Sequence, residues 1–313
     1  MSMIPFRLRK WYFDLITAEG HVLYLYFIAI NTVGIRQGYV SAHLTLAGGE
    51  SIKSWRSVKP NQITEKDKIL FGQNCLATHQ GHSHVQLQLD DLSVDLQYAS
   101  PPNGWITDED GMLIKGKNYL SWRVPQTRAT VAGILRAGSR EIKASGLGYH
   151  DFVEMTIPPW RLPFAEVLWG RAHCGAYTVV YDQIKTKGGD CLQHLLLREE
   201  KAGPVINSSG RDEQCALPKN VVETHSFSIH ADDADDETQL VHDVFTLDLH
   251  RRLILEEGLI ATDERIKPKL FKELLIRTSG EAMELKMLSD ATLRIGEIIA
   301  HGMAIHERVS WKV

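Results

Sequence analysis

Residues 84–98 alternate between apolar and polar side chains, and this pattern restricts the folds open to the chain. The alternation breaks once, at Asp90-Asp91, and then resumes. A repeat of two residues is that of a half-buried β-strand, so the segment predicts an antiparallel hairpin or a bulged strand. The apolar positions on its buried face are Val85, Leu87, Leu89, Leu92, Val94 and Leu96.

Turn-forming residues interrupt the rest of the chain at short intervals, for example at Gly48-Gly49, Asp110-Gly111 and Gly188-Gly189. Many short strands at such spacing are typical of a β-sandwich or β-barrel. An apolar stripe with helical spacing is clear only in residues 267–276, which predict a short accessory helix near the C-terminus. The sequence therefore predicts an all-β fold.

A proline-rich segment at residues 157–163 divides the sequence near its midpoint. Three prolines in seven residues cannot lie inside a central strand, because proline donates no hydrogen bond to a sheet. The length of 313 residues corresponds to two domains of about 150 residues each. We therefore expect an N-terminal domain at 1–156 and a C-terminal domain at 157–313.

Charge and cysteine content exclude several classes of protein. Thirty-five Lys and Arg against 39 Asp and Glu give a net charge of −4, so no nucleic-acid partner is expected. The four cysteines are scattered, which predicts thiols in a reducing compartment. The apolar residues 22–30 fall short of the roughly 20 that span a bilayer. We expect a cytoplasmic protein without stable membrane insertion.

No motif predicts a cofactor or a metal. The chain lacks a GxGxxG fingerprint, a Walker loop and a GxSxG nucleophile elbow, so no cofactor is expected. His79, His82 and His84 have a spacing that metal ligands can have, but Gly81 and Ser83 among them indicate an exposed turn. The acidic residues 232–237 lack the glycine and terminal glutamate of a calcium loop, so we expect a charged turn.

Residues 146–151 (GLGYHD) form the most unusual segment. Two glycines allow the backbone to turn sharply or to approach another strand closely. His150 and Asp151 are a titratable pair, but neighbours in a strand point to opposite faces unless a bulge intervenes. The alternative is a structural pair that stabilises the domain junction. Aromatic residues near both ends of this region suit either a pocket for a hydrophobic ligand or ordinary core packing.

Taken together, these segments resemble the carotenoid 1,2-hydratase (hydroxyneurosporene synthase) superfamily, whose relatives include lipocalin-like Diels–Alderases. The resemblance covers most of the chain and is strongest from Tyr119 to Asp182. The matching segments are, in order, Trp11-Tyr12-Phe13-Asp14, Tyr119-Leu120-Ser121-Trp122-Arg123-Val124-Pro125, Gly146-Leu147-Gly148-Tyr149-His150-Asp151, Trp169-Gly170-Arg171 and Tyr181-Asp182.

The resemblance implies two tandem lipocalin-like (calycin-like) antiparallel β-barrels with a hydrophobic ligand cavity in or between them. The chain departs from the hydratase pattern after His150-Asp151. Phe152 stands where hydratases have a second histidine, and Glu154 stands where they have a tryptophan. Protonation of an alkene by that second histidine and tryptophan is therefore not expected here.

The altered motif favours an enzyme that cyclises a hydrophobic polyene, isoprenoid or polyketide-like molecule, in the manner of a Diels–Alderase. A hydratase or lyase that uses Glu154 or Asp182 as the acid is the alternative, and a non-catalytic lipid or isoprenoid carrier is another. The candidate catalytic residues are His150, Asp151, Glu154, Tyr181 and Asp182. The candidate substrate-binding residues are Trp11, Tyr149, Phe152, Trp160, Trp169, Arg171 and Tyr177.

Overall fold

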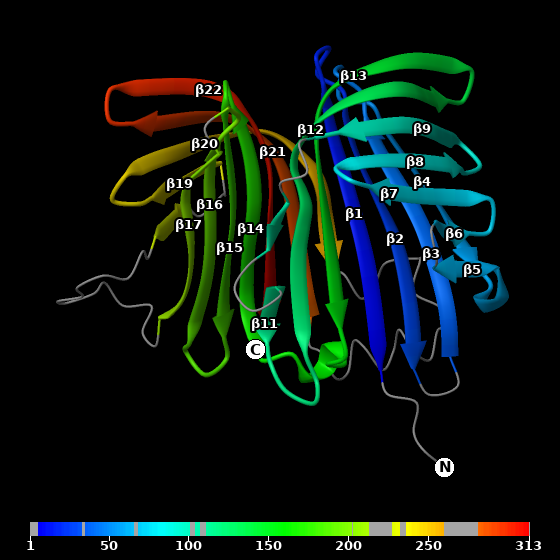
Figure 1. Cartoon of the computed structure of the whole chain (residues 1–313), viewed down its shortest axis with the longest axis horizontal. Helices are drawn as coiled ribbons and strands as arrows, with labels where there is room; N and C mark the ends of the chain where they lie inside the picture. Colours follow the sequence, from blue (N-terminus) through cyan, green and yellow to red (C-terminus); the bar gives the residue numbers. More distant parts are fainter. Residues whose placement is uncertain are drawn as a thin grey trace. The chain divides into compact units, whose positions relative to one another are not determined.

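The computed structural model describes residues 6–32, 35–65, 68–100, 104–106, 111–201, 203–212, 227–231, 236–259 and 281–312. The chain divides into two compact units, Met1–Pro158 and Pro159–Val313. Each unit is built on one antiparallel sheet that curls into a barrel-like form (Figure 1), which confirms the predicted all-β class with two lipocalin-like domains. The helix predicted at residues 267–276 lies outside the described residues.

In the first unit, the strands pair in the order β4-β3-β2-β1-β13-β12-β9-β8-β7-β6-β5, and β10 and β11 also pair with β12. The elements are β1 (Arg7–Thr17), β2 (Val22–Thr32), β3 (Ile35–Thr45), β4 (Ser51–Val58), η1 (Pro60–Gln62), β5 (Ile63–Glu65), β6 (Ile69–Phe71), β7 (Asn74–His79), β8 (His82–Gln88), β9 (Leu92–Ala99), β10 (Trp105–Ile106), β11 (Met112–Ile114), β12 (Leu120–Ala137) and β13 (Arg140–Met155).

In the second unit, the order is β17-β16-β15-β14-β22-β21-β20-β19-β18. The elements are η2 (Pro159–Arg161), β14 (Phe164–Cys174), β15 (Tyr177–Thr186), β16 (Cys191–Glu199), β17 (Gly203–Asp212), β18 (Ser228–Ala231), β19 (Glu237–Val241), β20 (Phe245–Leu259), β21 (Glu281–Ile295) and β22 (Ile298–Lys312). In both units, the first long strand therefore lies between the second strand and the last strand of the same unit.

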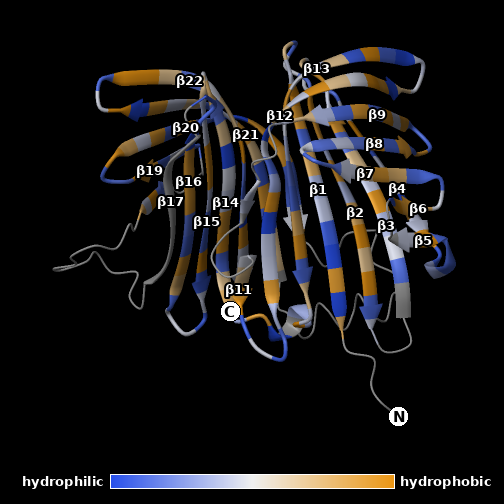
Figure 2. Cartoon of the chain, in the orientation of Figure 1, coloured by the Kyte–Doolittle hydropathy of each residue, from blue (hydrophilic) through white to orange (hydrophobic). Residues whose placement is uncertain are grey.

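The predicted hairpin of residues 84–98 is present as β8 paired with β9, with a turn at Asp90-Asp91. Its apolar residues are buried, and Figure 2 shows apolar and polar residues alternating along the strands. Because the sheet curls, the apolar residues of β8 and β9 join one core with those of β1 and β2. Phe71 illustrates this, since its ring lies 6.1 Å from that of Trp11 and 5.5 Å from that of Phe27.

The second unit has its own apolar core, to which β14, β15 and β16 contribute together with β19, β20 and β21. We call the face of each sheet that points into its core the inner face. Strand β1 is buried on both faces from Trp11 to Thr17, so its side chains show no alternation between buried and exposed. This double burial places polar groups of β1 where water does not reach them.

The structure also locates the histidine cluster, part of the acidic run and three of the cysteines that the sequence analysis considered. His79 and His82 flank an exposed turn in which Gln80 has a φ of 45°, and His84 pairs with Asp95 at 2.7 Å. Of the acidic run at 232–237, only the last two residues are described. The three described cysteines, Cys75, Cys174 and Cys191, are not joined to one another by disulfides. None of the helices in the described part of the chain has the length and hydropathy that a bilayer crossing requires.

Candidate functional site

The pairing of β1 with β13 sets the positions of His150 and Asp151. His150 lies opposite Phe13, and Asp151 lies opposite Tyr12, so the two neighbours occupy different faces of the sheet, as the strand geometry predicts. The His150 ring stacks on Phe13 on the inner face, with ring centroids 3.9 Å apart and planes inclined by 14°. Asp151 points to the opposite face.

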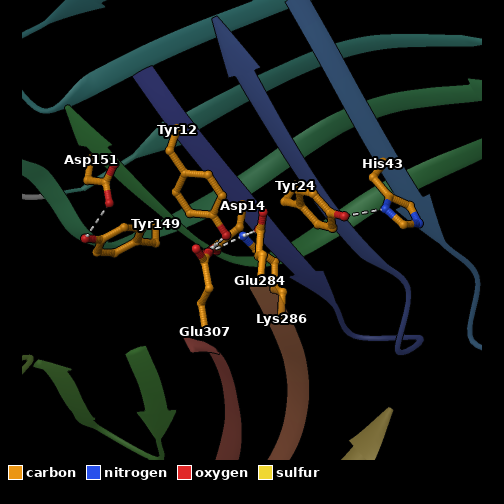
Figure 3. A network of polar contacts seen from close by, with 9 residues as sticks. All are labelled: Tyr12, Asp14, Tyr24, His43, Tyr149, Asp151, Glu284, Lys286 and Glu307. Atoms are coloured by element: carbon orange, nitrogen blue, oxygen red, sulfur yellow. Dashed lines mark hydrogen bonds and ion pairs between the residues drawn. The ribbon is translucent and has the colours of Figure 1, made fainter. Parts of the chain in front are cut away.

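That opposite face carries two tyrosines and two aspartates, which we call the tyrosine–aspartate face: Tyr12, Asp14, Tyr149 and Asp151. Each tyrosine donates a hydrogen bond to the aspartate two residues later on its own strand (Figure 3), at 3.0 Å on β1 and 3.2 Å on β13. Residues two apart in a strand share a face, and the antiparallel register places each aspartate opposite the other strand's tyrosine. All four side chains are buried.

The environment of Asp151 perturbs the pKa of its carboxyl strongly. Burial raises the pKa of its carboxyl from 3.8 to about 6, and the negative charge of Asp14 adds to the rise. Lys10 and the hydrogen bonds from Trp122 and Tyr149 act in the opposite direction. Trp122 Nε1 and Tyr149 Oη both donate to Oδ2, each at 3.2 Å. Oδ1 is buried and has no hydrogen-bond partner in the described part of the chain.

The tyrosine–aspartate face continues over β2 and β3. Tyr26 lies opposite Tyr12, and Tyr24 lies opposite Asp14. The Tyr24 hydroxyl forms a hydrogen bond with Nδ1 of His43, the residue opposite it on β3 (Figure 3). The result is a buried layer of aromatic rings with polar tips. Binding sites for hydrophobic ligands with a few polar groups have this composition.

His150 has a different environment. It is buried among apolar residues of the first core, and neither of its ring nitrogens has a hydrogen-bond partner within the described ranges. Burial lowers the pKa of His150 to about 3, because the charged imidazolium cannot be solvated there. His150 is therefore neutral at physiological pH and does not share a proton with Asp151 on the other face.

Three other predicted site residues of the first unit lie away from Asp151. Trp11 and Phe152 pack against one another within the inner core, with ring centroids 5.1 Å apart. Glu154, near the end of β13, forms an ion pair with Arg7 at 2.5 Å. A guanidinium thus holds the Glu154 carboxylate, whereas the neutral groups of Trp122 and Tyr149 donate to Asp151.

In the second unit, the predicted residues also separate into two faces. Tyr181 belongs to the inner core, and Tyr177 packs against it. Asp182 points to the opposite face, where it lies opposite Trp169 and forms a hydrogen bond of 2.5 Å with Nδ1 of His194. Arg171 shares that face and is fully buried. The side chain of Trp160 lies outside the described part of the chain.

The same face of the second sheet carries a buried ammonium group. Lys286 on β21 is fully buried and forms ion pairs with Glu284, at 3.1 Å, and with Glu307 (Figure 3). Burial raises the pKa of Glu284, and the charge of Glu307 raises it further, whereas Lys286 lowers it. Within the described residues, no group of three His, Cys, Asp or Glu is placed to hold a metal ion.

Sequence reasoning did not single out Asp14, Tyr24, His43 or Trp122. Tyr12 and Asp14 stand in the matched segment of β1, but without a known register they could not be assigned to the face of Asp151. One signal could have identified Asp14, since it is the lone carboxylate in the otherwise apolar run Trp11–Ile16. A carboxylate in such a run requires polar partners in the fold.

The sequence matches no protein-family model, and a search of curated proteins finds none with significant similarity. Solved structures with the same fold do exist. A protein from Nitrosomonas europaea described as AttH has a TM-score of 0.66 at 13% identity, over 98% of this chain and 93% of that one. CghA, solved with Sch210972, has a TM-score of 0.66 at 13% identity, over 98% and 89%.

Kievitone hydratase from Nectria haematococca has a TM-score of 0.59 at 8% identity, over 97% of this chain and 88% of the hydratase. At these identities the likeness establishes the fold and nothing finer. The chain as a whole, with both of its curled sheets, thus has the architecture of these three proteins.

Proposed function

We propose that the protein is an enzyme that converts a hydrophobic, conjugated small molecule, and that Asp151 donates a hydrogen bond or a proton to that molecule. The observation that carries this proposal is the environment of the Asp151 carboxyl. It is buried, Trp122 and Tyr149 donate to Oδ2, and Oδ1 has no hydrogen-bond partner among the residues that the structure describes. An orphaned buried oxygen is costly to a fold, and a functional role explains its presence.

The raised pKa of Asp151 suits such a role. With a value of about 6, both the acid and the carboxylate are populated near neutral pH. General acids and bases work best when their pKa lies near the working pH. The two donors to Oδ2 orient the carboxyl and leave Oδ1 as the atom available to a substrate.

Intramolecular cyclisation is the reaction we favour. Two π bonds of the substrate become two carbon–carbon σ bonds, and no atom is gained or lost. The protonated Asp151 donates a hydrogen bond to a conjugated carbonyl and retains its proton. Holding the reacting ends together supplies the larger part of the acceleration, and the hydrogen bond adds to it. The fold likeness to CghA, which is solved with Sch210972, supports a ligand-binding role for this architecture.

Addition of water to an alkene is a second candidate, because a pKa near neutrality permits complete proton transfer. Here Asp151 gives its proton to one alkene carbon, the oxygen of a water molecule adds to the other carbon, and a proton of that water returns to the carboxylate. The fold likeness to kievitone hydratase supports this alternative. It assigns to Asp151 the acid role that the sequence suggested for Glu154 or Asp182.

The test is to incubate the purified protein with metabolite extract from its producing organism and to follow the compounds by mass spectrometry. A product of unchanged mass and shifted retention supports cyclisation, and a change by one water supports hydration or dehydration. The Asp151→Asn variant should abolish hydration, because an amide gives up no proton, and it should slow cyclisation without abolishing it. Asp90→Asn, which alters an exposed carboxylate paired with Arg56, should convert the substrate like the wild type.

Two outcomes would overturn the proposal. One is a compound that co-purifies with the protein and is released chemically unchanged, which would identify a carrier. The other is full conversion by Asp151→Asn with loss of conversion in Asp182→Asn, which would move the acid to the second unit. A wild-type reaction that only slows as the pH rises through about 6 supports cyclisation, whereas one that is lost as the pH rises through that value supports hydration.

A further inference from the structure

The last strands of the two units share a pattern that the sequence alone did not reveal. Strand β13 reads Gly146-x-x-x-His150-Asp151, and β22 reads Gly302-x-x-x-His306-Glu307. Both strands pair with the first long strand of their unit, and both histidines lie on the inner face. Burial lowers the pKa of both histidines, to about 3 for the first and to about 4 for the second.

The two glycines of this pattern are required for the same reason. A Cβ on Gly146 would lie 2.1 Å from the carbonyl oxygen of Ile16, and a Cβ on Gly302 would lie 1.7 Å from that of His173. Each last strand therefore approaches the first strand closely at this point. Because Gly146 and Gly302 make the same kind of contact, the two last strands can be aligned on these glycines. Residues around His150 and His306 can then be compared position by position.

The comparison shows that the second unit has polar residues where the first unit has apolar ones. In the first unit, His150 lies opposite Phe13, and Phe13 lies opposite Leu25. Gly148, two residues before His150, lies opposite Ala129. In the second unit, His306 lies opposite Gly170, and Gly170 lies opposite Tyr181. Ala304, two residues before His306, lies opposite Ser289. We call Tyr181, Ser289 and His306 the inner polar trio.

The Tyr181 hydroxyl is the key member of this trio. A Cβ on Gly170 would lie 2.5 Å from Oη of Tyr181, so the tyrosine ring extends across β14 toward the strand that carries His306. Tyr181 is 2% exposed, and burial raises its pKa, with no hydrogen bond contributing.

The surroundings of the trio define what could bind. Oγ of Ser289 lies 2.7 Å from Nε2 of His306, and the charged groups further along the inner face pair with one another, since Glu166 is bound by Lys185 and Arg308. No unpaired charge among these residues calls for a counter-ion. The inner face also carries the glutamines Gln183 and Gln193, and its apolar residues include Val179, Leu195 and Ala304.

We propose that the inner polar trio of the second sheet is a binding site for the neutral oxygen group, a hydroxyl or carbonyl, of an otherwise apolar small molecule. Tyr181 donates a hydrogen bond to that oxygen, and Ser289 with His306 completes the polar contact. The site belongs to the second unit, whereas the proposed conversion depends on Asp151 in the first. This binding site goes beyond the proposed function, and it can be tested without knowledge of the enzyme's substrate.

Three probes with one apolar body test the chemistry: 2-naphthol, naphthalene and 2-naphthoate. Binding is measured by fluorescence titration of the full-length protein. We expect 2-naphthol to bind more tightly than the other two, since naphthalene has no oxygen and naphthoate is charged. The Tyr181→Phe variant should weaken 2-naphthol binding about tenfold, which corresponds to one lost hydrogen bond, and leave naphthalene binding unchanged.

Tyr181→Phe removes only a hydroxyl and keeps the ring, so it should unfold at nearly the same denaturant concentration as the wild type. Ser289→Ala serves as a second variant and should also weaken 2-naphthol binding selectively. Equal binding of 2-naphthol and naphthalene, or unchanged 2-naphthol binding in both variants, would overturn the site. The conversion assay with Asp151→Asn is independent, so either proposal can fail while the other stands.

Discussion

The hydroxyl of Tyr149 donates a hydrogen bond of 3.2 Å to Oδ2 of Asp151, two residues further along β13. This bond stabilises the ionised carboxylate and lowers a pKa that burial has raised. Tyr149→Phe removes the donor and keeps the ring, so the pKa of Asp151 should rise further above about 6. NMR titration of the Asp151 carboxyl carbon measures this pKa. An unchanged or lower pKa in Tyr149→Phe would contradict the hydrogen bond from Tyr149.

Asp151 should also affect stability. Its pKa is about 6 in the fold and 3.8 as the reference for an unfolded chain, so the folded state binds more protons between these values. Stability from this group is fully present below about pH 4 and is lost as the pH rises through about 6, by about 3 kcal/mol. Asp151→Asn removes this loss.

Urea unfolding of Asp151→Asn and the wild type at several pH values measures the effect. The variant should gain stability relative to the wild type as the pH rises from about 4 to about 7. Asp90→Asn, at an exposed position, serves as the control and should show no such trend. A constant difference between Asp151→Asn and the wild type would mean that Asp151 titrates normally.

His150 should have the opposite effect. Its pKa falls from 6.5 to about 3 on folding, so the unfolded chain binds more protons between these values. The stability is fully present above pH 6.5 and is lost as the pH falls toward about 3, by up to about 5 kcal/mol. His150→Phe retains a ring that can stack on Phe13 and removes the titration.

The free energy of unfolding of His150→Phe should therefore fall less on acidification than that of the wild type. His301→Phe, which changes an exposed histidine on β22, is the matched control. Parallel acid profiles for His150→Phe and the wild type would show that His150 is hydrated in solution.

Gly148 should tolerate no side chain. A Cβ there would lie 2.5 Å from the carbonyl oxygen of Asp14 and 2.7 Å from the Tyr98 ring. Because the first contact is with backbone, Gly148→Ala should lower the free energy of unfolding by about 3 kcal/mol. Gly48→Ala, where no atom lies within 4 Å, should change it little. Chemical denaturation compares the two, and equal effects would refute the close approach of β13 to β1.

The alternation of apolar and polar residues predicted those strands that have one face exposed to solvent. The β8–β9 hairpin is present as expected, because Val85 and Leu87 alternate with exposed glutamines. The rule that strand neighbours point to opposite faces correctly separated His150 from Asp151. These inferences needed only local geometry, which the sequence contains.

The tyrosine–aspartate face could not be predicted in the same way. Strand β1 is buried on both faces, so hydrophobicity does not show which side Tyr12 and Asp14 occupy. Its pairing with β13 joins residues more than a hundred positions apart, and their register determines that Asp151 meets Tyr12. The pattern around His306 was not recognised in the sequence, because it shares with β13 only a glycine, a histidine and an acidic residue.

The alternation of His150 and Asp151 across β13 has a consequence for what folding does to their protons. In an unfolded chain at about pH 5, the imidazole is a cation and the carboxylate an anion. In the fold at that pH, burial makes both groups neutral. Folding thus transfers one proton from a histidine to its neighbour through the solvent, and a zwitterionic dipeptide becomes an uncharged one with almost no net uptake or release.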